Sequence, residues 1–420
     1  MRTTAVYALL LVTFTQLVNA ASANSAQSTP NVVMIISDDQ GWTDFGFMGH
    51  DEIQTPHLDQ LASQSAVFAN GYVPSSLCRP SLATMITGLY PHQHLILGND
   101  PRGKVPREQL AAYLWKQPTL PKLLAAKSYL SQQTGKWWEG DITKSGFTHG
   151  PANTNRHGSN NDPQGLRIGR NGMQPIFDFL DEAQKQEKTF FLWYAPFLPH
   201  TPHNPPARLL QKYQRDGRPL KLAKYFAMCE WFDETCGQLL SYLDDHQLSE
   251  NTLVCFVVDN GWTSGGAIPG SHAKRSPFDG GVRTPILLRW PGKIAAGRRE
   301  DLVSSVDLAP TILAACDVEA PSDLPGLNLM DLLADKAPPR ETVFGECYEH
   351  DVLELGNPAA SLRYRWCRHG DWKLIVGQNS KQLFHLRDDP HEAHDLSKQQ
   401  PDRVAALEKV LDAWWNPGNR

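Results

Sequence analysis

The sequence has no excess of basic residues. Forty lysines and arginines stand against 45 aspartates and glutamates, which gives a formal net charge of -5 at pH 7. A chain without a basic surplus lacks the electrostatic basis for broad binding to nucleic acid or to anionic lipid. We therefore expect no nucleic-acid partner, and any anion that the protein binds must be held by a local site.

Long apolar runs are missing as well, apart from one near the N-terminus. Residues 5–18 are mostly apolar, follow Met1 and Arg2, and lead into small residues around Ala20. This pattern is typical of a secretory signal peptide that is cleaved after Ala20. The run is also shorter than the roughly 20 apolar residues that a membrane span needs. We predict a signal peptide over residues 1–20, a periplasmic or secreted protein and no stable membrane insertion, with an uncleaved N-terminal anchor as the alternative.

Cysteines are few and irregularly spaced. There are seven, and they form neither a C-x-x-C pair nor a cysteine and histidine pattern, so a zinc site is not expected. An odd number leaves at least one thiol free even in an oxidising compartment. Cys229 and Cys236 are seven residues apart on an expected helix, which is too far for a bridge between them. The sequence assigns no disulfide pairing.

Two apolar, β-branched runs, residues 31–37 and 252–258, predict buried strands. Helical periodicity is found in the segments 55–64, 119–126, 174–182 and 221–245. Alternation of strands with helices predicts an α/β fold, with a mostly parallel sheet covered by helices on both faces. Loops rich in glycine, proline, asparagine and histidine, at 146–172 and 198–206, are expected to form walls of a site.

The pattern of apolar and polar residues changes near residue 340. Short alternating segments follow at 342–346, 372–376 and 382–386, and a final helical segment covers 402–415. We predict a catalytic domain over residues 21–340 and a small α+β C-terminal subdomain over residues 341–420.

Cys78 stands at the expected start of a helix. It precedes Pro80, which suits a first helical turn, and Gly88 can close the helix ten residues later. The free N–H groups and the dipole at a helix start favour an anion or a nucleophile. A lone cysteine is nevertheless more often a buried structural residue.

The segment Cys78-Arg79-Pro80-Ser81, continuing to Thr87-Gly88-Leu89-Tyr90-Pro91, resembles the signature of the formylglycine-dependent sulfatases. This resemblance implies an alkaline-phosphatase-like fold and oxidation of Cys78 by a formylglycine-generating enzyme. In that family the aldehyde is hydrated to a gem-diol, one hydroxyl of which attacks sulfur while the other later expels sulfate. The resemblance covers residues 31–333 and reappears at 383–396.

Acidic and amide side chains follow both predicted strands: Asp38 and Asp39 after the first, Asp259 and Asn260 after the second. The carboxyl ends of parallel strands meet at one edge of a sheet, so the two pairs are expected to meet. Their oxygens are the hard ligands that calcium or magnesium prefers. The resemblance implies one Ca²⁺ per chain, held by these four residues together with the modified Cys78.

Two lysines and a histidine match further positions of the family. Lys136 and Lys274 resemble the lysines that grip the sulfate group, and cationic donors suit that role. His200 matches a histidine near the scissile oxygen, where an imidazolium could protonate the leaving alkoxide. We predict that these three residues and Cys78 are catalytic, and that His272 contributes to substrate binding.

Two positions depart from the commoner family pattern. Leu82 stands where an arginine usually follows the signature cysteine, and Trp138 stands where a histidine usually follows the first lysine. The resemblance implies that this arginine helps the modifying enzyme and steadies the nucleophile. Cys-Arg-Pro-Ser-Leu together with Gly-Lys-Trp-Trp resembles a subset of bacterial carbohydrate sulfatases. Trp137 and Trp138 could stack on a sugar ring or pack in the core.

The prediction is therefore a sulfuric ester hydrolase, with sulfated carbohydrates favoured over aryl sulfates as substrates. One alternative is a weakly active homologue that binds sulfated glycans, which the departures at Leu82 and Trp138 would permit. Another is a phosphohydrolase of the same superfamily. Asp259-Asn260-Gly261 argues against that alternative, because two-metal phosphatases of this fold have Asp-His-Gly and more histidine ligands.

Overall fold

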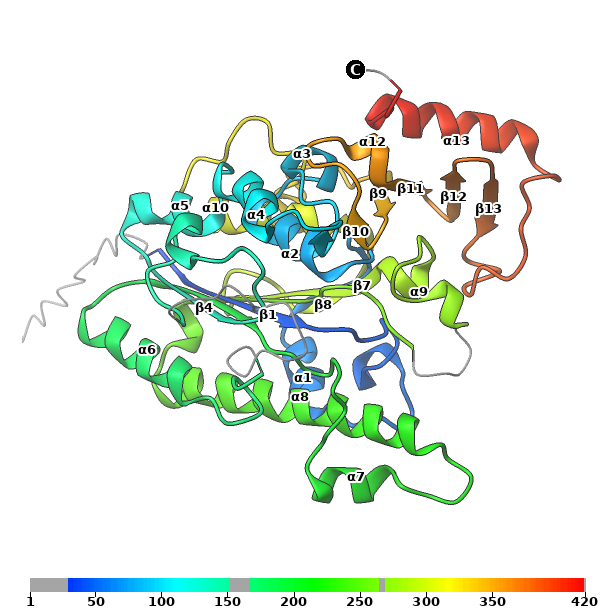
Figure 1. Cartoon of the computed structure of the whole chain (residues 1–420). Helices are drawn as coiled ribbons and strands as arrows, with labels where there is room; N and C mark the ends of the chain where they lie inside the picture. The colour runs from blue at the N-terminus through cyan, green and yellow to red at the C-terminus, as the bar shows by residue number, and fades with distance from the viewer. Residues whose placement is uncertain (1–28, 152–165, 264–268, 419–420) are drawn as a thin grey trace, which may run out of the picture.

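The computed structural model describes residues 29–151, 166–263 and 269–418. The predicted signal peptide, residues 1–20, lies outside the described residues. Among the helices described, none is long and apolar enough to cross a membrane. Figure 1 shows a central sheet between two layers of helices, and a second sheet beside the C-terminal helix.

The central sheet has seven strands in the order β4-β5-β1-β6-β7-β2-β8. Their bounds are β1 Asn31–Ser37, β2 Ala66–Tyr72, β4 Leu130–Gly135, β5 Phe190–Ala195, β6 Thr252–Val258, β7 Arg283–Arg289 and β8 Gly297–Ser304. The strands β4, β5, β1 and β6 are parallel, β7 runs antiparallel to both of its neighbours, and β2 is parallel to β8. The two strands predicted from apolar runs, β1 and β6, thus lie side by side at the centre of a mostly parallel sheet.

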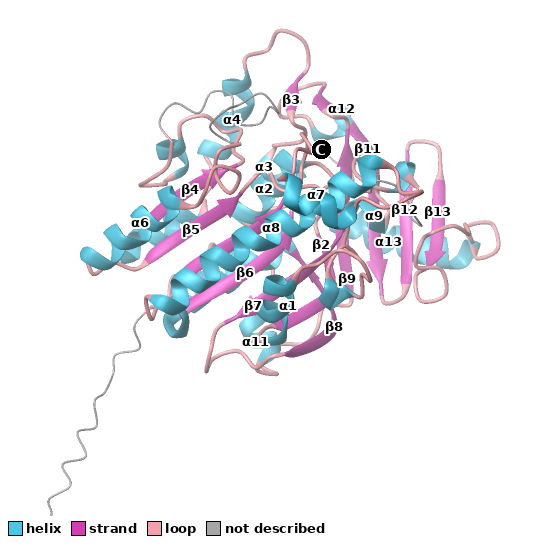
Figure 2. Ribbon diagram, turned by 90° about the horizontal axis from the view of Figure 1, so that it is seen from below, coloured by secondary structure: helices cyan, strands magenta, loops and turns pink. Residues whose placement is uncertain are grey.

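Both faces of the sheet are covered, as predicted (Figures 1 and 2). One face, with Val33 and Ile35 of β1, packs on α1 (Pro56–Ser63), α6 (Gln174–Lys185) and α8 (Leu220–Asp245), and α7 (Ala207–Tyr213) packs on α8. The other face, with Val32 and Met34, packs on α2 (Cys78–Thr87), α4 (Arg107–Trp115), α5 (Leu120–Leu124), α10 (Leu308–Ala315) and α11 (Leu329–Leu333). Alternate residues of one strand therefore supply both cores, which explains why the strand is apolar throughout.

The C-terminal part forms an antiparallel sheet in the order β13-β12-β11-β9. Its elements are β9 Thr342–Tyr348, α12 Pro358–Ser361, β11 Leu362–His369, β12 Trp372–Gly377, β13 Lys381–His385 and α13 Pro401–Trp414. Three of the four strands and the helix were predicted. β11 was not, because its arginines hide the apolar signal, although Trp366 and Cys367 in this strand are fully buried. The boundary at residue 340 stays a prediction.

The remaining short elements connect these layers. They are α3 Pro91–His94, α9 Asp279–Val282, and the two-residue strands β3 Asp100–Pro101 and β10 Asp351–Val352, which pair with each other. All seven cysteines are free and buried. Cys229 and Cys236 lie on α8, as expected, and no disulfide contributes to this fold.

Candidate active site

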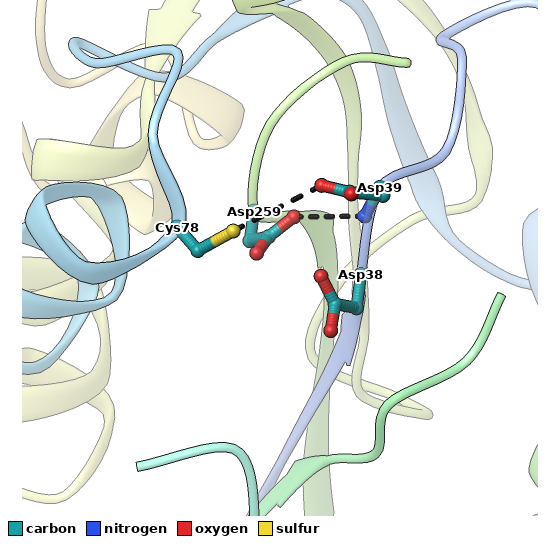
Figure 3. A group of neighbouring side chains, drawn as sticks. All are labelled: Asp38, Asp39, Cys78 and Asp259. Atoms are coloured by element: carbon teal, nitrogen blue, oxygen red, sulfur yellow. Dashed lines mark hydrogen bonds between the residues drawn. The ribbon is translucent and has the colours of Figure 1, made fainter. Parts of the chain in front are cut away.

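The predicted acidic pairs meet at one edge of the central sheet. β1 and β6 are parallel and in register, with Ser37 opposite Val258, so the residues that follow them emerge together. The backbone N–H of Asp39 donates to Asp259 Oδ1 at 3.1 Å, and Asn260 Nδ2 donates to Asp39 Oδ1 at 2.7 Å. Asp39 adopts a left-handed φ of 58°, a conformation that aspartate tolerates better than most residues. The side chains of Asp38, Asp39 and Asp259 face a shared space (Figure 3).

Cys78 enters the same space from the opposite side (Figure 3). It is the first residue of α2, and Gly88 ends this helix in the left-handed conformation, as predicted. The Sγ atom of Cys78 lies 3.9 Å from Asp39 Oδ1 and 2.9 Å from Lys274 Nζ. The cysteine is therefore in contact with both a carboxylate and an ammonium group.

The two lysines reach the carboxylates from separate segments. Lys136 follows Gly135, whose φ of +76° and close approach to Ala195 leave no room for a side chain. Lys136 Nζ is paired with Asp38 Oδ1 and lies 3.4 Å from Asp259 Oδ2. Lys274 Nζ donates to Asp39 Oδ1 at 2.6 Å. Two ammonium groups thus face three carboxylates.

His200 closes another side of the group. It lies on the loop after β5, between the cis peptide bonds Leu198–Pro199 and Thr201–Pro202. Its Nε2 atom is 3.4 Å from Asp39 Oδ2, and its Nδ1 atom is 2.7 Å from the Thr201 carbonyl oxygen. If Nδ1 carries the proton, it donates to this carbonyl and leaves Nε2 directed at the site.

His272 and the two tryptophans 137 and 138 pack against aromatic or core residues. The imidazole of His272 stacks on the Phe278 ring with a centroid distance of 3.7 Å, so its role in substrate binding stays a prediction. Trp137 and Trp138 are buried, with 2% and 8% of their surface exposed. They pack in the core. The sequence left stacking on a sugar ring and core packing both open, and this burial disfavours stacking on a sugar ring.

Burial and mutual repulsion shape the pKa values of the acids. Burial raises the pKa of Asp38 to about 6, although Lys136 opposes the shift. Burial, followed by the charge of Asp38, raises the pKa of Asp259 to about 7. Burial alone would raise the pKa of Asp39 too, but Lys274, His200 and Lys136 together hold it well below its usual range. The three carboxylates are too close for all of them to ionise readily without additional positive charge.

The same environment acts on the cationic and thiol groups. Burial disfavours the charged form of each lysine, yet the pKa of both lysines lies above the usual range, chiefly because Asp38 faces Lys136 and Asp39 faces Lys274. Burial raises the pKa of the Cys78 thiol. Burial lowers the pKa of His200 to about 4, with Asp39 opposing this and the lysines adding to it. The lysines are thus charged while the thiol and the imidazole are neutral near pH 7.

The donor set fits a hard cation. Ligand atoms of Asp38, Asp39, Cys78 and Asp259 all lie within 4.8 Å of one another. Asp38 Oδ2 and Asn260 Oδ1 are buried and have no hydrogen-bond partner among the described residues. Buried oxygens of this kind are rarely left unpaired, and carboxylate and amide oxygens are what Ca²⁺ binds.

Sequence reasoning missed Arg170, which holds the His200 loop. Its guanidinium donates to the carbonyl oxygens of Phe197 at 2.6 Å, His200 at 2.9 Å and Pro202 at 3.1 Å. Burial lowers the pKa of Arg170 to about 10, with the charge of Asp38 opposing the shift. Arg170 is one of three arginines in a loop rich in glycine and asparagine and belongs to no motif, so the sequence offered no signal for this contact.

Comparison with known proteins decides the family. Residues 30–318 match the family described as Sulfatase, and residues 269–413 match the family described as N-sulphoglucosamine sulphohydrolase, C-terminal. The chain belongs to the sulfatase family. It is 30% identical to human arylsulfatase A, over 91% of this chain and 87% of that protein. It is 27% identical to the N-acetylgalactosamine-6-sulfatase of Canis lupus familiaris, over 92% of this chain and 85% of that protein.

A solved structure shares the fold of this sulfatase. The structure of Ps i-CgsB in complex with k-i-k-neocarrahexaose matches with a TM-score of 0.76 and 25% identity, over 92% of this chain and 93% of the other. The predicted alkaline-phosphatase-like architecture and the predicted sulfuric ester hydrolase class are therefore both confirmed.

Proposed function

We propose that this sulfatase hydrolyses sulfate esters of carbohydrates with a formylglycine made from Cys78 and one Ca²⁺ per chain. The observation that carries the proposal is that Cys78 and two lysines meet at a group of carboxylate and amide side chains. Two buried oxygens of that group have no hydrogen-bond partner among the described residues. Sugar sulfates are favoured because a relative named above is a sulfatase for N-acetylgalactosamine and a structural neighbour binds a neocarrahexaose.

The proposed Ca²⁺ site comprises Asp38, Asp39, Asp259, Asn260 and the modified Cys78. When bound, Ca²⁺ supplies positive charge that favours the ionised nucleophile and neutralises sulfate. In the structure, Cys78 Sγ stands where the hydroxyl oxygens of the hydrated aldehyde would lie. Lys274, at 2.9 Å from that atom, then donates to the nucleophile or to a sulfate oxygen beside it.

Lys136 and His200 complete the proposed mechanism. Lys136 lies between Asp38 and Asp259 and offers its remaining N–H donor to the sulfate group. His200 supplies the proton that the departing sugar oxygen takes up, from Nε2. Burial lowers the pKa of His200 to about 4, and the two lysines contribute to this shift. For His200 to carry the proton near pH 7, the negative charge of the bound sulfate has to raise this pKa again.

The experiment is desulfation of a panel of sulfated mono- and oligosaccharides, with aryl sulfates and phosphate esters included. The protein is produced with a formylglycine-generating enzyme, and Cys78→Ala serves as the inactive control. The peptide that contains Cys78 should be lighter than the thiol form by the exchange of sulfur and two hydrogens for one oxygen. Active protein with an unmodified Cys78 would exclude this mechanism, and preference for phosphate esters with zinc would support a phosphohydrolase.

Maturation and location are part of the same proposal. Because Leu82 replaces the usual arginine of the signature, the modified fraction of Cys78 needs to be measured together with activity. We further propose that the protein is exported to the periplasm or the medium, where sulfated polysaccharide fragments would be available. Detection of a mature N-terminus at residue 21 would test the proposed cleavage after Ala20.

A further inference from the structure

The two departures from the family pattern meet in space. Leu82 and Trp138, which replace an arginine and a histidine, are both buried. Together with Arg79 and Glu139 they line a cavity of only about 10 Å³. A cavity of that size holds at most one water, so the side chains around Leu82 and Trp138 are closely packed.

A buried ion pair stands directly beside this contact. Arg79 Nε lies 2.7 Å from Glu139 Oε1, Arg79 Nη2 lies 2.7 Å from Glu139 Oε2, and Nη1 donates to the Asn99 carbonyl oxygen at 2.9 Å. The side chains are 0% and 4% exposed. This bidentate geometry pairs the guanidinium fully with a carboxylate. Arg79 therefore does not supply a free positive charge to a bound sulfate.

The pair joins the two segments that carry the reacting groups. Arg79 follows Cys78 in the first turn of α2, and its backbone N–H donates to Asn99 Oδ1 at 3.1 Å. Glu139 comes three residues after Lys136, and its carbonyl oxygen accepts from Trp115 Nε1 at 2.8 Å. Both main chains are thus held at the pair itself.

Trp138 completes the link to Lys136. The centroid of its ring lies 5.1 Å from Lys136 Nζ, so the ring forms a wall along the ammonium group. A shift of the segment 136–139 relative to α2 would move Lys136 with respect to Cys78. The Arg79–Glu139 pair thus ties the segment that carries Lys136 to the helix that carries Cys78.

We infer that Arg79 and Glu139 are positioning residues, which fix Lys136 relative to Cys78 in place of the contacts that the arginine and histidine of the commoner pattern would make. This inference rests on the proposed function of Cys78 and Lys136. It also implies that Arg79 takes no direct part in binding the sulfate group.

The test compares Arg79→Lys, Glu139→Gln and the double variant Arg79→Met/Glu139→Met with the parent protein, in the presence of calcium. A single change leaves a buried charge unpaired and can destabilise the fold, whereas removal of both partners avoids that cost. The double variant is therefore the one expected to remain folded. Arg365→Lys, which alters a partly buried arginine–aspartate pair between β11 and α13, is the matched control.

Five quantities are measured for each variant: the melting temperature, the modified fraction of Cys78, kcat and KM on the best substrate, and the Kd for inorganic sulfate. We expect the double variant to melt near the parent and to lose about 10- to 100-fold in kcat per modified molecule, since displacement of a reacting group by about 1 Å can cost that much. The Kd for sulfate should rise about tenfold, because a displaced Lys136 donates less well. Arg365→Lys should leave kcat and Kd unchanged.

The inference would be overturned by a folded double variant whose kcat per modified molecule and sulfate Kd equal those of the parent. It would also be overturned if the whole loss of activity matched the loss of modified Cys78. If the parent hydrolyses no sulfate ester, the proposed function fails instead. The sulfate Kd still tests the positioning pair in that case, because it requires no turnover.

Discussion

Two buried groups of lysines and carboxylates in this protein are built differently. In the first, which we call the site cluster, Lys136 and Lys274 face Asp38, Asp39 and Asp259. In the second, the Lys373 cluster, Lys373 Nζ lies 2.8 Å from Asp279 Oδ1 and 2.9 Å from Glu392 Oε1. The Lys373 cluster joins α9 of the core to β12 of the C-terminal sheet.

The difference lies in the balance between carboxylates and cationic side chains. In the Lys373 cluster, Asp279 Oδ2 also accepts from Tyr72 at 2.9 Å and lies 3.6 Å from Arg283 Nη1, while Glu392 Oε2 accepts from the backbone N–H of Asp279 at 2.5 Å. Two carboxylates thus meet two cationic side chains. The site cluster has three carboxylates for two lysines. Asp38 Oδ2 and Asn260 Oδ1 there, and Glu392 Oε1 in the Lys373 cluster, are buried without a hydrogen bond among the described residues, but Lys373 Nζ lies 2.9 Å from Glu392 Oε1. In the balanced cluster each charge is met by an opposite charge, whereas an excess of negative charge beside unpaired buried oxygens indicates a place for a bound cation.

The largest expected effect on stability comes from breaking the balanced cluster. Lys373→Met leaves two buried carboxylates without their shared cation, which should cost about 3–5 kcal/mol of unfolding free energy. Chemical denaturation measures this loss. The kcat per folded molecule should stay near that of the parent, because Lys373 does not contact the site cluster. A large fall in kcat with unchanged stability would contradict the structural role of this cluster.

The same substitution in the site cluster should have the opposite signature. Lys136→Met removes a proposed sulfate donor and should lower kcat about 10²- to 10³-fold. The excess negative charge that remains should also make stability depend more strongly on calcium. Steady-state kinetics, corrected for the modified fraction of Cys78, check the first effect. Turnover that survives Lys136→Met would remove this lysine from the proposed mechanism.

Calcium removal should separate the two clusters by stability alone. A cation that binds only the folded protein stabilises it by about 2.7 kcal/mol when present at 100 times its Kd. Chelation should therefore lower the melting temperature of the parent, and calcium should restore it. Asp259→Asn should weaken this response, while Lys373→Met should be less stable but respond to calcium as the parent does. An equal response in parent and Asp259→Asn would argue against a cation at the site cluster.

The part of this architecture that was predictable from the sequence is the part encoded by contiguous residues. The apolar runs of β1 and β6 identified the central strands, and the acids that follow them were expected at one edge because parallel strands end together. The cysteine of α2 and the two lysines were assigned through resemblance to a family. In the structure all three lie at the site cluster, and the roles assigned to them stay predictions.

Contacts between distant segments were not predictable in this way. Arg79 and Glu139 are 60 residues apart, and neither is unusual in its local sequence. Trp137 and Trp138 follow a lysine at a strand end, and the sequence left stacking on a sugar ring and packing in the core both open; tertiary packing buries both. The strand β11 was hidden because its arginines alternate with apolar residues, and three of them, Arg363, Arg365 and Arg368, find carboxylate, hydroxyl or carbonyl partners.

The smallest expected effect on stability comes from breaking an exposed ion pair, which tests whether burial makes the Lys373 cluster sensitive to substitution. Lys381 on β13 lies 2.7 Å from Glu408 Oε2, a distance similar to those in the Lys373 cluster, but its side chain is 46% exposed. Exposed pairs contribute only about 0.2–1 kcal/mol, because water screens the charges and solvates each partner alone. Lys381→Met should therefore change the unfolding free energy by less than about 1 kcal/mol and leave kcat unchanged. A loss comparable to that of Lys373→Met would mean that charge pairing itself, and not the desolvation of an unpaired carboxylate, sets the cost of breaking these contacts.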